Sequence, residues 1–332
     1  MPRIGLVLGG GGIVGMAYHG AVLAAVHETT GWDPREAEVV VGTSAGAASG
    51  AELRAGLSGA DMAARREGTP FTAEGERLLR ALGPPPQVAP HQEAVDVDRA
   101  RASMRRLLTR SMMRPGSVPA GVLTSVAASP GRLSASWLSR QVRWLHGGDE
   151  WPDRRFWSCT VDLDRGTRVV LGRDDAPPAP LGAAVAASCA IPGVFAPVAI
   201  GERLYIDGGG WSPTNADVLA GHALDLAVIV SPMTALPGAL GRREDWWLRT
   251  ACRRMLVAEV GKLRARGTAV AIVEPDAAEL RCMGQITRHE VLDERRCPAI
   301  VERVRAATSA RIRAGALPQL SLLGDDDDAA AA

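Results

Sequence analysis

The chain has 332 residues, of which 46% are hydrophobic and 23% charged, an ordinary balance for a soluble globular protein. Its formal net charge is only +1, so we do not expect nucleic acid as a partner. No apolar stretch reaches the roughly 18 residues of a membrane-spanning helix and no signal peptide is evident, which predicts a cytoplasmic protein. Any contact with a membrane would then be peripheral.

The first 60 residues predict two strand–helix units. The apolar run at residues 4–8 is typical of a buried strand, and the small apolar residues at 17–26 predict a helix. A second strand, at 39–41, precedes an alanine-rich helix that starts at Ala45. Because glycines occupy both strand-to-helix turns, this alternation predicts an α/β fold with a mainly parallel sheet.

Residues 65–155 differ in character, because prolines separate short helical stretches. We predict that they form a helical, Pro-rich cap inserted into a single domain of residues 1–324. In the helix expected over residues 98–113, an apolar face consists of Met104, Leu107, Leu108 and Met112, and four arginines fall largely elsewhere, at 101, 105, 106 and 110. This pattern favours a helix that packs on the core with a solvated basic face; a cap that touches a membrane is the alternative.

The strand pattern resumes after residue 155. Further strands are predicted at residues 157–162, 168–171, 198–200, 204–206, 226–230 and 269–273, and a helix is predicted at 245–266. Short glycine-containing turns join the first two of these strands and also the next two, which predicts hairpins. The aspartates and alanines at 325–332 predict a disordered tail rather than a cation site.

Five cysteines are scattered along the chain, at Cys159, Cys189, Cys252, Cys282 and Cys297. Their number is odd and none forms a CxxC pair. This argues against a disulfide framework or a zinc site and fits a reducing compartment.

The first candidate site is the segment Gly42-Thr43-Ser44-Ala45-Gly46, between the second strand and its helix. A serine on so sharp a turn exposes its hydroxyl, and Gly42 and Gly46 avoid side-chain clashes at the bend. The positive end of the following helix favours negative charge that develops there. The segment therefore predicts Ser44 as a nucleophile; the alternative is an ordinary helix N-cap serine.

Consecutive glycines from Gly9 to Gly12, followed by Gly15, form the first strand-to-helix turn. Their exposed backbone N–H groups suit a phosphate or an oxyanion equally well. Gly10, Gly12 and Gly15 also satisfy the pattern GxGxxG, but a dinucleotide site requires an acidic residue at the end of the second strand. That strand ends in Gly42 instead, which disfavours a dinucleotide.

Two further segments stand out later in the chain. A nucleophilic serine needs a base, and Asp207-Gly208-Gly209 follows a predicted strand, where a carboxylate could approach another loop closely. In isolation this string is more typical of an Asp-Gly turn. Residues 187–195, ASCAIPGVF, predict the end of a small-residue helix followed by a proline-glycine turn, without evident chemistry of their own.

Taken together, residues 10–15, 42–46, 187–195 and 207–209 resemble, in order and rough spacing, the four motifs of the patatin-like phospholipase family. The resemblance covers most of the chain up to the last predicted strand, and residues 65–155 only loosely. It implies a three-layer α/β/α patatin-like fold and a hydrolase of lipid acyl esters with no metal or other cofactor. By this resemblance Ser44 would attack the ester carbonyl and Asp207 would act as base. The oxyanion would be held by the N–H groups of Gly10, Gly11 and Gly12.

One position departs from the family pattern. Val14 stands where the family usually has arginine or lysine, before the last glycine of the oxyanion loop. Because the donors are backbone groups, loss of this side chain need not abolish activity. Val14 nevertheless supports an alternative, a catalytically weak or silent lipid-binding protein.

A second alternative is an α/β-hydrolase with a Ser-Asp-His triad. The chain order would permit Ser44, Asp207 and then His222 or His289. Neither histidine has catalytic-looking neighbours, so both are more typical of surface residues. His19, on the helix after the glycine loop, is predicted to pack in the interior.

Overall fold

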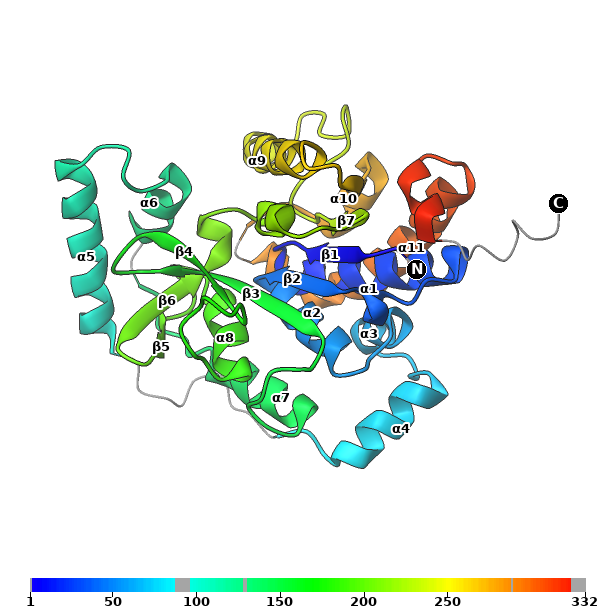
Figure 1. Cartoon of the computed structure of the whole chain (residues 1–332), viewed down its shortest axis with the longest axis horizontal. Coiled ribbons are helices and arrows are strands. Elements are labelled where there is room, and N and C mark those ends of the chain that lie inside the picture. Colours follow the sequence, from blue (N-terminus) through cyan, green and yellow to red (C-terminus); the bar gives the residue numbers. More distant parts are fainter. Residues whose placement is uncertain (1, 87–95, 128–129, 288, 324–332) are drawn as a thin grey trace.

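The computed structural model describes residues 2–86, 96–127, 130–287 and 289–323, and within them an eight-stranded sheet crosses the middle of the molecule (Figure 1). The tail predicted at 325–332 lies outside these residues. The strand order is β5-β6-β3-β2-β1-β7-β8, and β4 pairs with β3. The strands are β1 (Ile4–Leu8), β2 (Val39–Thr43), β3 (Arg155–Asp162), β4 (Thr167–Leu171), β5 (Val198–Ile200), β6 (Arg203–Asp207), β7 (Leu226–Val230) and β8 (Ala269–Val273).

The pairing confirms the predicted, mainly parallel sheet. Strands β3, β2, β1, β7 and β8 run parallel to one another. Antiparallel pairs join β4 and β6 to β3, and β5 to β6, so both predicted hairpins are present. Continuous apolar runs such as Val39–Val41 form the central strands because a parallel sheet is buried on both faces.

Alternate residues of β1 point to opposite faces of the sheet, and each face packs against its own layer of helices. Leu6 and Leu8 pack with α1, α2, α3 and α11 on one face of the sheet. Val7, between them, packs on the other face with Leu256 and Val260 of α9. The predicted three-layer α/β/α fold is therefore confirmed.

The helices are α1 (Gly12–Thr30), α2 (Ala45–Arg54), α3 (Gly59–Glu67), α4 (Ala73–Leu82), α5 (Val97–Met113), α6 (Ala120–Ala127), α7 (Ser136–His146), α8 (Leu181–Ser188), α9 (Trp246–Arg264), α10 (Ala277–Met283) and α11 (Cys297–Arg313). Among the described residues, none of these helices combines the length and apolar character that crossing a bilayer requires. The five cysteines are all free.

The predicted insertion contains α4 to α7, and α5 forms one end of the molecule (Figure 1). Met104 and Leu107 of α5 are buried against α6 and the end of β3, as predicted for the apolar face. The prediction that Met112 belongs to the buried apolar face is wrong, because this residue is 83% exposed. Its position one turn beyond the last core contact explains the difference, since the helix extends past the surface that it covers.

Helices α1 and α3 cross at unusually short range. A Cβ atom on Gly20 of α1 would lie 2.7 Å from the backbone nitrogen of Ala63, and one on Gly59 of α3 would lie 2.5 Å from that of Ala24. The buried Asp61 closes the start of α3 through a capping box with Ser58. This contact fixes the position of α1, whose N-terminus forms part of the site described below.

The crossing predicts opposite effects for two glycine substitutions within helices. Gly20→Ala should lower the free energy of unfolding by about 1–3 kcal/mol, because the added methyl group meets backbone atoms that have little room to move. Gly261→Ala in α9 is the matched control, since no atom lies within 4 Å of its added Cβ. It should raise stability by up to about 1 kcal/mol through helix propensity alone. Urea unfolding of both variants measures the difference, and equal effects would contradict the close crossing.

Candidate active site

Ser44 lies on the sharp turn between β2 and α2, where the sequence predicts it. Its φ of 54° and ψ of −121° are strained for a residue with a side chain, and it is only 6% exposed. A Cβ atom on Gly46 would overlap the carbonyl oxygen of Leu8, and one on Gly42 would overlap the backbone of Ala47. The two glycines therefore permit the turn, as predicted. The Ser44 side chain makes no N-cap hydrogen bond, unlike the ordinary helix-capping serine of the alternative interpretation.

The segment 187–195, which had no evident chemistry, holds the backbone of this turn. The Ser44 N–H donates to the hydroxyl of Ser188 at 2.9 Å. That hydroxyl in turn donates to the carbonyl oxygen of Cys159 at 2.6 Å. The thiol of Cys189 donates to the Ser44 carbonyl oxygen at 3.1 Å. Ser188 and Cys189 thus restrain the candidate nucleophile from both sides of its peptide, a role that sequence reasoning missed.

Asp207 ends β6 and lies beside Ser44. The residue is 6% exposed, and its carboxylate accepts a hydrogen bond from the Gly209 N–H at 2.7 Å. Burial raises the pKa of Asp207 to about 6, against the opposing effects of hydrogen bonding from the Ser44 side chain and from Gly209. Gly208 is required here, because a Cβ atom on it would overlap the carbonyl oxygen of Cys159. The structure therefore brings Ser44 and Asp207 together from distant parts of the sequence.

The glycine loop lies across the same site at the start of α1, but its amides are not equivalent. The Gly10 N–H donates to the carbonyl oxygen of Pro213 at 2.8 Å. This pairing argues against the predicted use of the Gly10 amide as an anion donor in this conformation. Within the described part of the chain, the N–H groups of Gly11 and Gly12 have no such acceptor. They are unsatisfied donors at the positive end of a helix, where an anion binds favourably.

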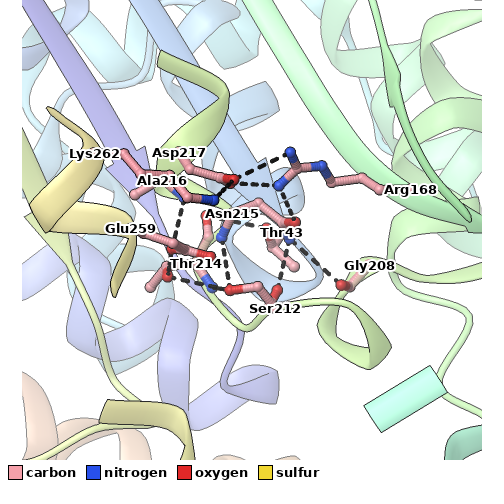
Figure 2. A network of polar contacts seen from close by, with 10 residues as sticks. All are labelled: Thr43, Arg168, Gly208, Ser212, Thr214, Asn215, Ala216, Asp217, Glu259 and Lys262. Carbon is pink, nitrogen blue, oxygen red and sulfur yellow. Dashed lines mark hydrogen bonds and ion pairs between the residues drawn. The ribbon is translucent and has the colours of Figure 1, made fainter. Parts of the chain in front are cut away.

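A buried polar network supports the turn from the other side (Figure 2). Asn215, whose φ of 51° is left-handed, donates from its side-chain nitrogen to the Thr43 hydroxyl at 3.1 Å and to the Ser212 carbonyl oxygen at 2.6 Å. A longer bond of 3.4 Å reaches the Gly208 carbonyl oxygen. Asn215 thus links the residue before Ser44 to the residue after Asp207. It also belongs to the loop that carries Pro213, the acceptor for Gly10.

Charged side chains complete this network. Glu259 of α9 accepts the Thr214 hydroxyl at 2.6 Å and the Ala216 N–H at 2.9 Å, and burial raises the pKa of Glu259. Arg168 donates to the side-chain oxygen of Asn215 at 3.2 Å and pairs with Asp217 (Figure 2). These contacts fix the orientation of the Asn215 amide. No motif in the sequence indicates them, because the partners come from β4, α9 and an irregular loop.

Two cavities meet at Ser44. The first has a volume of about 230 Å³ and is lined by the three loop glycines, Asp207 and Ser125 of α6, among others; we call it the Asp207 cavity. The second has a volume of about 200 Å³ and is lined mainly by α2 and α7; we call it the α2–α7 cavity. Residues of the predicted insertion therefore line both cavities.

The histidines of the alternative triad lie elsewhere. His222 packs on the ring of Trp157, and its pKa is lowered by burial and by the nearby charge of Arg155, against an opposing effect of Glu38. Those neighbours belong to the opposite ends of β2 and β3 from Ser44. His289 is exposed and lines neither cavity. His19 is fully buried and lies 3.0 Å from the Ser49 hydroxyl, which confirms the predicted packing role.

Val14 faces the interior. Its side chain is 3% exposed and belongs to the core beneath the sheet. The departure from the family pattern therefore replaces a basic side chain by an apolar one that is fully packed. Within the described residues, no grouping of three or more His, Cys, Asp or Glu side chains could hold a metal ion.

The raised pKa of Asp207 predicts a pH-dependent effect of Asp207→Asn on stability. The native state binds this proton more tightly than the unfolded chain, whose carboxyl has the ordinary value of 3.8. The associated stability is present below about pH 4 and is lost as pH rises to about 6. The free energy of unfolding of the variant should therefore exceed that of the wild type by up to about 3 kcal/mol at about pH 8, and by much less at about pH 4. Urea unfolding at both pH values measures this, and an equal difference at both would contradict it.

A comparison with protein-family models finds the family that the four motifs resemble. The family model described as patatin-like phospholipase matches residues 6–220. No curated protein matches the sequence.

Two solved structures resemble the fold at a low level. VipD from Legionella pneumophila has a TM-score of 0.36 and 15% identity, over 93% of this chain and 67% of that one. Human GIVD cytosolic phospholipase A2 has a TM-score of 0.36 and 13% identity, over 97% of this chain and 62% of that one, so the chain spans less than two thirds of the human chain. Values this low carry no functional argument. The match to the family model spans more than half of the sequence and includes Ser44 and Asp207. The chain therefore belongs to the patatin-like phospholipase family, and this membership supports lipid acyl hydrolysis as its general activity.

Proposed function

We propose that the chain is a serine esterase of the phospholipase A type, with Ser44 as nucleophile and Asp207 as its base. One observation carries this proposal: a strained serine and a buried carboxylate of raised pKa border the same cavity as two backbone amides that have no hydrogen-bond acceptor among the described residues. Nucleophile, base and oxyanion donors are the parts that acyl transfer requires.

The proposed reaction has two stages, acylation of Ser44 and hydrolysis of the acyl-enzyme. The Ser44 oxygen attacks the carbonyl carbon of the ester while its proton passes to Asp207. The carbonyl oxygen becomes an oxyanion, which accepts hydrogen bonds from Gly11 and Gly12, each worth about 3 kcal/mol to the transition state. The tetrahedral species then releases the alcohol, which takes the proton from Asp207. Water then attacks the carbonyl carbon of the acyl-enzyme while one of its protons passes to Asp207. The bond to the Ser44 oxygen breaks, this oxygen takes the proton back from Asp207, and the free acid is released.

In this proposal Gly10 has a supporting role, because its N–H bond to Pro213 holds the loop in place. The pKa of Asp207, about 6, suits the task of a base near neutral pH. Such a carboxylate is mostly ionised at pH 7, yet it is a stronger base than an exposed aspartate. Val14 supports the alternative of a catalytically silent lipid-binding protein. Such a protein would have no use for a serine placed beside a buried carboxylate.

Replacement of Ser44 or Asp207 should remove all or nearly all of the esterase activity. Ser44→Ala should remove both p-nitrophenyl ester hydrolysis and labelling by an alkyl fluorophosphonate, because no nucleophile remains. Asp207→Asn should lower kcat by a factor of about 1,000 or more, because the serine loses its base. Steady-state rates and labelling measure both effects.

The histidine variants separate the dyad from a triad. His222→Ala and His289→Ala should keep the esterase rate within about three-fold of wild type, because neither residue lines the cavities at Ser44. A collapse of the rate in one of them would favour a Ser-Asp-His mechanism.

We further propose that α5 contacts the surface of anionic membranes. Its exposed side carries arginines and two methionines, Met112 and Met113, which are 83% and 78% exposed. Within the described residues three arginines have no acidic partner, namely Arg105 and Arg110 of α5 and Arg114 directly after it. A basic helix with exposed apolar side chains suits the boundary between lipid headgroups and acyl chains. The next helix, α6, contributes Ser125 to the Asp207 cavity, so contact at α5 would bring the site close to lipid.

Neutralising these arginines should weaken membrane binding. Substitution of Arg105, Arg110 and Arg114 by glutamine should lower affinity for vesicles of phosphatidylcholine mixed with phosphatidylglycerol by roughly 100-fold, since each basic residue contributes about 1 kcal/mol. Vesicle sedimentation measures the affinity, with pure phosphatidylcholine as reference. A matched control replaces the exposed arginines of α9 and its C-terminal end, Arg254, Arg264 and Arg266. An equal loss in both variants would contradict a specific role of α5.

A further inference from the structure

The two cavities at Ser44 differ in their access to Asp207. Ser44 borders both of them, whereas Asp207 borders only the first. In the proposed reaction Asp207 returns a proton to the leaving alcohol, so the alcohol must lie on the Asp207 side of the serine. The acyl chain then extends the other way, into the α2–α7 cavity.

The walls of the α2–α7 cavity suit an alkyl chain. Small side chains of α2, at Ala45, Ala48 and Ala51, recur at the spacing of one helical turn and line one wall. Leu138 and Val142 of α7 also line the cavity. Such a narrow, largely apolar space would remove an acyl chain from water without leaving polar groups unpaired.

The far end of this cavity is charged. Glu52, on the last turn of α2, is 7% exposed and accepts a hydrogen bond from Arg66 at 2.7 Å. Arg65 lies 3.5 Å from the same carboxylate oxygen. The other oxygen of Glu52 is buried and has no hydrogen-bond partner within the described residues. A longer alkyl chain would have to separate this pair or desolvate it further, and both are unfavourable.

We propose that the α2–α7 cavity binds the acyl chain of the substrate and that the Glu52–Arg66 ion pair limits its length, so that medium-chain acyl esters are preferred. This inference rests on the proposed function. Ala45 and Glu52 are about 10 Å apart along the helix axis. An extended alkyl chain advances about 1.25 Å per carbon, so about eight carbons fill this distance.

A series of p-nitrophenyl esters from acetyl to palmitoyl tests the limit. For the wild type, kcat/KM should be greatest near octanoyl and at least about ten-fold lower for palmitoyl, measured below the concentration at which the esters aggregate. Ala48→Leu narrows the cavity halfway along its length. The chain-length optimum of this variant should move to about butanoyl, and its kcat/KM for octanoyl should be about ten-fold lower than for butanoyl. Val142→Phe narrows the same space from α7 and serves as a second variant if Ala48→Leu does not fold.

Ser125→Leu is the matched control, because it adds the same side chain to the Asp207 cavity. Its chain-length optimum should stay near octanoyl whatever its overall rate. An optimum at palmitoyl, or one that neither cavity variant moves, would overturn the acyl-site inference. If no ester is hydrolysed and a short alkyl fluorophosphonate does not label Ser44, the proposed function itself fails, so the two failures are distinguishable.

Discussion

Burial of the Asp207 carboxylate beside the Ser44 hydroxyl is the constraint on which the rest of the site depends. A buried carboxylate resists ionisation, which makes it a better proton acceptor, but the same burial destabilises the fold near neutral pH. The compensation is local, because one backbone N–H from Gly209 and the serine side chain hold the carboxylate. Apolar burial elsewhere in the three-layer core supplies the stability that the site lacks.

The supporting structure converges on the two loops that carry these residues. Ser188, at the end of α8, accepts a hydrogen bond from the backbone of Ser44. Asn215 donates hydrogen bonds to Thr43, the residue before Ser44, and to Gly208, the residue after Asp207. The same loop accepts the Gly10 N–H through Pro213, so the glycine turn, the serine and the carboxylate share one framework. In the proposed function, α5 would bring the chain to a lipid surface, and the α2–α7 cavity would select among the acyl chains found there.

Local patterns predicted the strands and the turn at Ser44, because continuous apolar runs and glycines at tight bends reflect short-range constraints. The membership in the family was predicted by the resemblance of the four motifs. The meeting of Ser44 with Asp207 was expected only through the resemblance of the four motifs. The bond from Gly10 to Pro213 and the part played by Asn215 were not predictable, since they join residues far apart in sequence. Met112 was misplaced because the helix pattern continues past the end of the surface that buries it.

The rate at which an alkyl fluorophosphonate labels Ser44, measured against pH, tests the central claim most directly. If Asp207 is the base, the labelling rate should rise about ten-fold per pH unit below an apparent pKa near 6 and then reach a plateau. The same dependence should vanish, together with most of the rate, in Asp207→Asn. A rate that is independent of pH between about pH 4 and 8, or one that Asp207→Asn leaves unchanged, would contradict the account.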